Sequence, residues 1–149
     1  MAADTIDDLK TLHTHAVDAR NGYEEALHDA EGRGMTPLFQ DMIALHTTNA
    51  DELSALLARL GQQPDQNGSF MTTIHRTIMR VRSLFGGLDA SVVPGLIDGE
   101  KRNVSRYAET LENQDISADV RVLLAKQRHR IEAAIVAMDG VKACSDGAC

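Results

Sequence analysis

A single carboxylate interrupts an apolar helix face in the stretch PGLIDGEKRNVSRYAETL, residues 94–111. The apolar positions of this stretch are Leu96, Val104, Tyr107 and Leu111. At about 100° per residue, Glu100 falls near the centre of the face that they form. A buried carboxylate must be protonated, hydrogen-bonded, ion-paired or metal-bound, because an isolated buried charge is costly. Glu100 therefore indicates either a metal site or a hydrogen-bonded layer inside a helical bundle.

Polar side chains occupy similar places on the other helical segments. Asn49 and Gln127 fall at the centres of their apolar faces, and Arg130 follows Gln127 by one turn. Arg20 lies on the flank of the first apolar stripe. If the helices are in register, these residues form one buried polar layer with Glu100. In that layer the amides or a guanidinium would neutralise the carboxylate and fix the pairing of the helices.

The alternative is a dinuclear iron or manganese site. Such a site needs a Glu from each of two helices and a Glu-x-x-His motif from each of the other two. The Glu-x-x-His of this chain is Glu25–His28, on the outward side of the first helix, and the fourth helix offers only an amide and a guanidinium. Glu100 and His46 could hold one metal ion between them. We therefore expect no cofactor, with iron or manganese on Glu100 and His46 as the alternative.

Four long amphipathic segments predict an all-α protein. They run from about Thr5 to Ala30, Pro37 to Leu60, Ala90 to Asn113 and Ser117 to Val141. The chain has two Tyr, three Phe and no Trp, so Ala, Leu, Ile, Val and Met must fill the core, which suits helices.

The ends of these segments carry the usual helix signals. Thr5 and Ser117 are expected as N-caps, and Gly61 is expected to end the second helix. Gly95 and Gly99 weaken the third helix, so we expect a neighbouring element to pack closely against them.

The connection between the second and third helices is long, from Gly61 to about Ala90, and it contains a further short helix over residues 70–85. The first two helices are joined tightly and so lie antiparallel. A long connection can then cross the bundle, which predicts the up-down-down-up topology of ferritin-like four-helix bundles. Residues 1–142 form this one domain.

The remaining residues, 143–149, are expected to form a flexible tail that carries Cys144 and Cys149. Their disulfide would close only a small loop, and two thiols alone make a weak metal site. The formal net charge of −7 argues against nucleic acid and anionic membranes as partners. No segment resembles a membrane span or a signal peptide, so we expect a cytoplasmic protein.

Several short motifs occur in a recognisable order. They are Gly22–Tyr23, Glu52–Leu53, Leu60–Gly61, the linker NGSFMTTIHRTIMRVRS, Gly99–Glu100, Tyr107 and Gln127. With these motifs the chain resembles a bacterial ferritin-like family of four-helix-bundle proteins, known as domain of unknown function 2383, over about Thr5 to Lys142. The resemblance implies a ferritin-like fold and no settled activity.

These observations predict a non-catalytic, stress-related bacterial protein that acts as a homodimer or through a protein partner. Ile43 and Leu57 lie off the apolar stripe of the second helix, where a second copy or the short helix of the long connection could cover them. The rival hypothesis is a divergent metal-dependent oxidase or metal-storage protein that uses Glu100 and His46. A redox role for the thiols of Cys144 and Cys149 is a third hypothesis.

Overall fold

The described part of the chain is a bundle of four helices. The computed structural model describes residues 3–29, 34–63 and 92–145. The helices are α1 (Ala3–Asp29), α2 (Thr36–Arg59), α4 (Val93–Leu111) and α5 (Ala118–Ser145). No strand occurs within those residues, which confirms the predicted all-α class.

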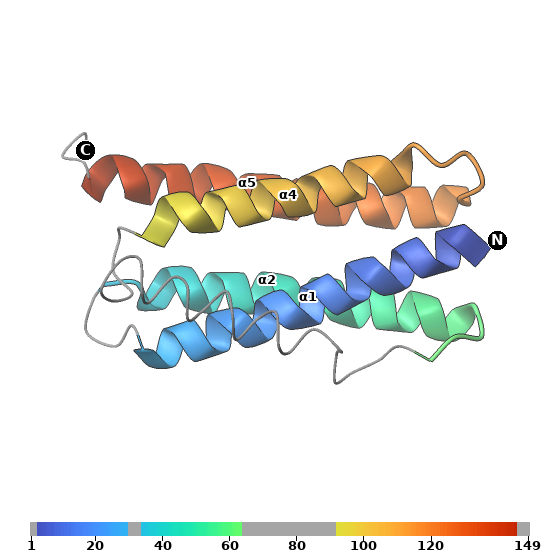
Figure 1. The fold of residues 1–149 in the computed structure, drawn as a ribbon, viewed down its shortest axis with the longest axis horizontal. Coiled ribbons are helices and arrows are strands. Elements are labelled where there is room, and N and C mark those ends of the chain that lie inside the picture. Colours follow the sequence, from blue (N-terminus) through green and yellow to red (C-terminus); the bar gives the residue numbers. More distant parts are fainter. Residues whose placement is uncertain (1–2, 30–33, 64–91, 146–149) are drawn as a thin grey trace.

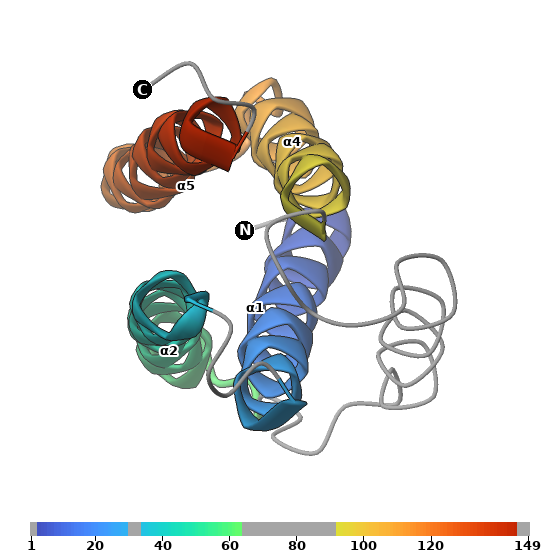
Figure 2. The same cartoon turned by 90° about the vertical axis from the view of Figure 1, so that its left-hand side faces the viewer.

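The helices run in the order predicted for a crossed bundle. Figure 1 shows α1 and α5 running in one direction, and α2 and α4 in the opposite direction. Helix α1 pairs with α2 and α4 pairs with α5, while α1 lies beside α4 and α2 beside α5 (Figure 2). Every neighbouring pair is therefore antiparallel, in the up-down-down-up topology. The short helix predicted over residues 70–85 lies outside the described residues.

Two predicted helix ends are confirmed. Gly61 has a φ of 75°, and the backbone N–H groups of Gly61 and Gln62 donate to the carbonyls of Ala58 and Leu57. These bonds form the Schellman motif, which needs a left-handed residue and therefore favours glycine. At the start of α5, the Ser117 hydroxyl accepts a hydrogen bond from the backbone N–H of Val120 at 3.4 Å.

Thr5 has another role than the predicted cap, since α1 begins at Ala3. The Thr5 side chain is buried, and its hydroxyl accepts a 2.8 Å hydrogen bond from the amide of Asn113. This bond joins the first turn of α1 to the segment that follows α4. It helps to fix the position of α4 along α1, which in turn places the polar residues of α4.

The expectation that a neighbour packs against Gly95 and Gly99 is wrong. Within the described part of the chain, a methyl group at Gly95 would meet nothing within 4 Å, and one at Gly99 would meet only the end of Arg102, at 3.9 Å. We therefore expect Gly99→Ala to raise the free energy of unfolding by about 0.5–1 kcal/mol, because glycine lowers helix stability.

Thermal unfolding of Gly99→Ala should then show a melting temperature about 2–4 °C higher. Gly61→Ala is the matched control and should be destabilising, because its φ of 75° is unfavourable for alanine. A loss of stability in Gly99→Ala would contradict the open surroundings of this glycine.

The core weakens the basis of the predicted dimer. Leu57 is fully buried, and Ile43 is partly buried and packed against the core. Leu57 is therefore not available to a second copy, and Ile43 is available only in part. The apolar face of α2 is thus wider than the predicted stripe, as expected for a helix that contacts two neighbours.

Candidate functional site

Glu100 lies inside the bundle and contacts two other helices. Its side chain is on α4, and the residue is 5% exposed. Its Oε1 atom accepts a 2.9 Å hydrogen bond from the hydroxyl of Tyr23 on α1 and lies 2.9 Å from Nε2 of His46 on α2. Glu100 therefore joins three helices through one oxygen atom. We call Tyr23, His46 and Glu100 the Glu100 cluster.

Ring packing holds the two partners of Glu100 in place. The rings of Tyr23 and His46 are stacked, with centroids 5.7 Å apart and planes at 12°. Phe39 packs on the same tyrosine, at a centroid distance of 6.0 Å. Since all these side chains are buried, the polar ends of both rings are aimed at the carboxylate with little freedom to turn.

The cluster favours an ionised carboxylate beside a neutral phenol. Burial acts to raise the pKa of Glu100, but the charge and hydrogen bond of His46, with the hydrogen bonds of Tyr23 and Asn103, outweigh it and leave the pKa below its usual value. Burial and the neighbouring carboxylate both raise the pKa of Tyr23 well above 10.0. The phenol thus stays protonated at neutral pH and donates to Glu100.

Several buried polar atoms around the cluster lack a hydrogen-bond partner within the described residues. They are Glu100 Oε2, His46 Nδ1, Asn49 Nδ2 and Asn103 Oδ1. The four atoms come from two positions one turn apart on α2 and two positions one turn apart on α4. Because most buried polar atoms in proteins are hydrogen-bonded, this grouping marks the bundle centre as a place that can bind a polar ligand, a water or an ion.

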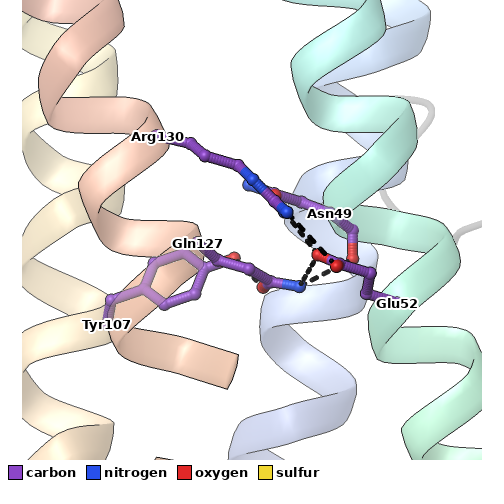
Figure 3. A network of polar contacts seen from close by, with 5 residues as sticks. All are labelled: Asn49, Glu52, Tyr107, Gln127 and Arg130. Carbon is purple, nitrogen blue, oxygen red and sulfur yellow. Dashed lines mark hydrogen bonds and ion pairs between the residues drawn. The ribbon is translucent and has the colours of Figure 1, made fainter. Parts of the chain in front are cut away.

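A second polar cluster links α2 to α4 and α5, and we call it the Glu52 network (Figure 3). Arg130 forms an ion pair with Glu52 through both terminal nitrogens, and its Nη1 atom also donates to Asn49 Oδ1 at 3.0 Å. The hydrogen bond from Arg130 is the main cause of a lowered pKa of Glu52. Both charges are therefore paired at neutral pH.

Gln127 completes the Glu52 network from a fully buried position. Its Oε1 atom accepts a 2.8 Å hydrogen bond from the hydroxyl of Tyr107. Its Nε2 atom donates to the backbone carbonyl of Asn49 and to Glu52 Oε1, each at 3.2 Å. One amide thus connects α4, α5 and α2, which is a structural use of a buried polar group.

The residues of the predicted single layer therefore have different partners. Gln127, Asn49 and Arg130 lie together, but around Glu52, whereas Glu100 contacts His46 and Tyr23. Among the described residues, neither an amide of Gln127 or Asn49 nor a guanidinium contacts Glu100.

Arg20 belongs to neither cluster. It is half-buried, and its guanidinium donates to the side chain of the adjacent Asn21 at 3.3 Å. The predicted place of Arg20 in the polar layer therefore has no support from its contacts.

Sequence reasoning missed the central role of Glu52. It lies three residues after Asn49, so it shares the same side of α2. This spacing could have indicated that Glu52 belongs to the same polar cluster as Asn49. Tyr23 and Tyr107 are members of apolar stripes, and a buried tyrosine hydroxyl needs a hydrogen-bond partner. The structure supplies those partners as Glu100 and Gln127.

The predicted flexible tail overlaps the end of α5. Helix α5 continues to Ser145, so Cys144 lies on a helix, past the predicted domain boundary at 142. Cys149 lies outside the described residues. The described ranges contain no group of three or more His, Cys, Asp or Glu side chains that could hold a metal ion.

A further buried carboxylate, Asp18 on α1, allows a pH prediction. Asp18 is 8% exposed, its Oδ1 atom has no hydrogen-bond partner in the described part of the chain, and burial raises its pKa from 3.8 to about 6. At pH 7 this group is ionised in both the folded and the unfolded chain, so the folded state bears the full cost of its burial. The cost disappears as the pH falls through about 6 toward 3.8.

We expect Asp18→Asn to raise the free energy of unfolding at pH 7 by about 1–2 kcal/mol. The difference from wild type should shrink as the pH is lowered to 4. His15, whose pKa burial and Arg106 lower to about 4, loses stabilisation over the same range, but it is present in both proteins and cancels in the difference. Urea unfolding at several pH values measures this, and a difference independent of pH would contradict the prediction.

The helix directions and the two buried polar clusters define an all-helical four-helix-bundle protein. The chain belongs to the family described as a domain of unknown function, DUF2383, which matches residues 4–113. The match includes α1, α2 and α4, while α5 lies beyond it. No curated protein and no solved structure matches the chain. Within the described residues, no helix has the length and apolar character needed to cross a membrane.

Proposed function

We propose that this chain is a non-catalytic bundle protein that acts by association with a second copy of itself or with another protein. The observation that carries the proposal is the Glu52 network. Where a dinuclear site would need a Glu-x-x-His motif on α5, Gln127 and Arg130 bond to Glu52 instead. A guanidinium has no lone pair to offer a metal and repels cations, so this half of the bundle centre serves to hold helices together.

The outer face of α5 supports association. Val122 is 68% exposed and Val136 is 71% exposed, and they are the exposed large hydrophobic residues of the described ranges. They lie two heptads apart on one helix, so they share one side of it. This pair takes the place of Ile43 and Leu57 as the basis for self-association. A stress-related role and a cytoplasmic location stay predictions.

The test is the molar mass of the protein by light scattering over a wide range of concentrations. We expect a dimer whose fraction rises with concentration in wild type and falls in the double variant Val122→Lys, Val136→Lys. The double variant Ala44→Lys, Ala55→Lys, which adds the same two charges at exposed sites on α2, is the control and should still associate. A strict monomer at every concentration would exclude self-association and leave a different protein as the partner.

A further inference from the structure

Three metal-ligating atoms meet in the Glu100 cluster. Oε1 of Glu100 lies 2.9 Å from the hydroxyl oxygen of Tyr23 and 2.9 Å from Nε2 of His46. Neighbouring ligands of an octahedral ion with bonds of about 2.1 Å are about 3.0 Å apart. Both separations from Oε1 therefore match those of neighbouring ligands on one ion. An ion bound at Oε1 would replace the hydrogen bonds that Tyr23 and His46 now make to Glu100.

The cluster also has oxygen atoms that could bind a metal ion and that make no described hydrogen bond. Glu100 Oε2 and Asn103 Oδ1 are buried acceptors without a hydrogen-bond partner among the described residues, one turn apart on α4. The second carboxylate oxygen lies next to the first by covalent geometry. It can therefore provide a further ligand atom to an ion held at Oε1.

We propose that Tyr23, His46 and Glu100 form a mononuclear site for ferric iron. The site goes beyond the association function, and it differs from a dinuclear centre because α5 contributes no ligand to it. One of its three ligand side chains is a tyrosine. The site is therefore compatible with the finding that the described ranges contain no group of three His, Cys, Asp or Glu side chains.

The donor set selects the class of ion. Phenolate and carboxylate are hard anionic oxygen donors, and imidazole is a good ligand for iron. Together the two anions supply two negative charges against the three positive charges of the ion, in a chain whose net charge is −7. Magnesium and calcium prefer carboxylate, carbonyl and water oxygens, whereas ferric iron is a strong Lewis acid that also binds phenolate.

Binding changes the protonation of the ligand side chains but not the oxidation state of the iron. The Tyr23 hydroxyl releases its proton to solvent as the oxygen–iron bond forms, and Glu100 binds as the carboxylate. His46 binds through the lone pair of Nε2, so the proton between Nε2 and Glu100 is also released to solvent, and a hydrogen stays on Nδ1, the nitrogen without a described partner. Water completes the coordination of the iron.

The experiment uses the full chain after treatment with a chelator. The protein receives one equivalent of ferric iron as its nitrilotriacetate complex and is desalted. Bound iron is then measured together with the visible absorption spectrum, and resonance Raman spectra of the wild type identify phenolate vibrations. Tyr23→Phe is the test variant. Tyr107→Phe is the matched control, because it removes the other buried tyrosine hydroxyl of the bundle centre.

We expect one ferric ion per wild-type chain, with a phenolate-to-iron charge-transfer band. The band should vanish in Tyr23→Phe, with iron retention lower by roughly tenfold or more, and persist in Tyr107→Phe. A band that survives in Tyr23→Phe would overturn the assignment. Iron bound without phenolate vibrations in the wild type, or no iron after desalting, would overturn it as well. These wild-type readings do not depend on how well the variants fold.

Discussion

Glu100→Ala is expected to lower the free energy of unfolding of the metal-free protein by about 3–4 kcal/mol. The substitution removes the acceptor of two buried groups, the Tyr23 hydroxyl and His46 Nε2, and leaves a cavity where four side-chain atoms were. A buried polar group without a partner costs about 1–3 kcal/mol, and here two groups lose their acceptor while a cavity is left as well. Urea unfolding followed by far-ultraviolet circular dichroism measures the loss.

Glu109→Ala is the control for this prediction, because it removes an exposed carboxylate from the same helix. We expect it to change stability by less than about 0.5 kcal/mol. Glu100→Gln keeps an oxygen at the acceptor position but loses the charge, so its effect should lie between the two. Equal stabilities of Glu100→Ala and Glu109→Ala would show that the Glu100 cluster does not hold α1, α2 and α4 together.

The fold of the described residues follows from features that the sequence displays directly. Each helix carries a long apolar stripe, and Gly61 ends α2 because its left-handed conformation closes the Schellman motif. The tight first connection and the long second one imply the helix directions. These are properties of single helices and of connection lengths, so no knowledge of side-chain contacts was needed.

The candidate site could be predicted only in part, for a physical reason. The helical period tells which side chains face the interior, and it correctly placed Glu100, Asn49 and Gln127 there. It does not tell how each helix is rotated or shifted against its neighbours. The rotation and level of α5 against α4 and α2 decide whether Gln127 meets Glu100 or, as observed, Tyr107 and Glu52, and the sequence does not fix them.

Long side chains add a second uncertainty. Arg20 starts on the flank of the α1 stripe, and its flexible chain bends to the neighbouring Asn21 rather than into the core. Arg130 starts at a similar position on α5 and reaches across to α2. The difference depends on which helix lies opposite each arginine and on whether that helix has a carboxylate within reach. Both are properties of the tertiary structure.

Gln127→Met is expected to lower the free energy of unfolding by about 2–3 kcal/mol. Methionine fills nearly the same volume, so the loss arises from hydrogen bonds and not from a cavity. The Tyr107 hydroxyl is then left buried without its acceptor, and an unsatisfied buried group costs about 1–3 kcal/mol. The donation to Glu52 disappears at the same time. Urea unfolding again provides the measurement.

A second substitution separates the hydrogen bond from the other contacts of Gln127. Tyr107→Phe alone should cost about 1–2 kcal/mol, because it leaves Gln127 Oε1 without its donor. In the Gln127→Met background the same change removes a hydroxyl that already lacks a partner, so it should cost nothing or restore some stability. The two losses would then combine to less than their sum, with a coupling of at least about 1 kcal/mol. Additive losses would mean that the hydroxyl and the amide act independently, and that the Glu52 network is not one connected unit.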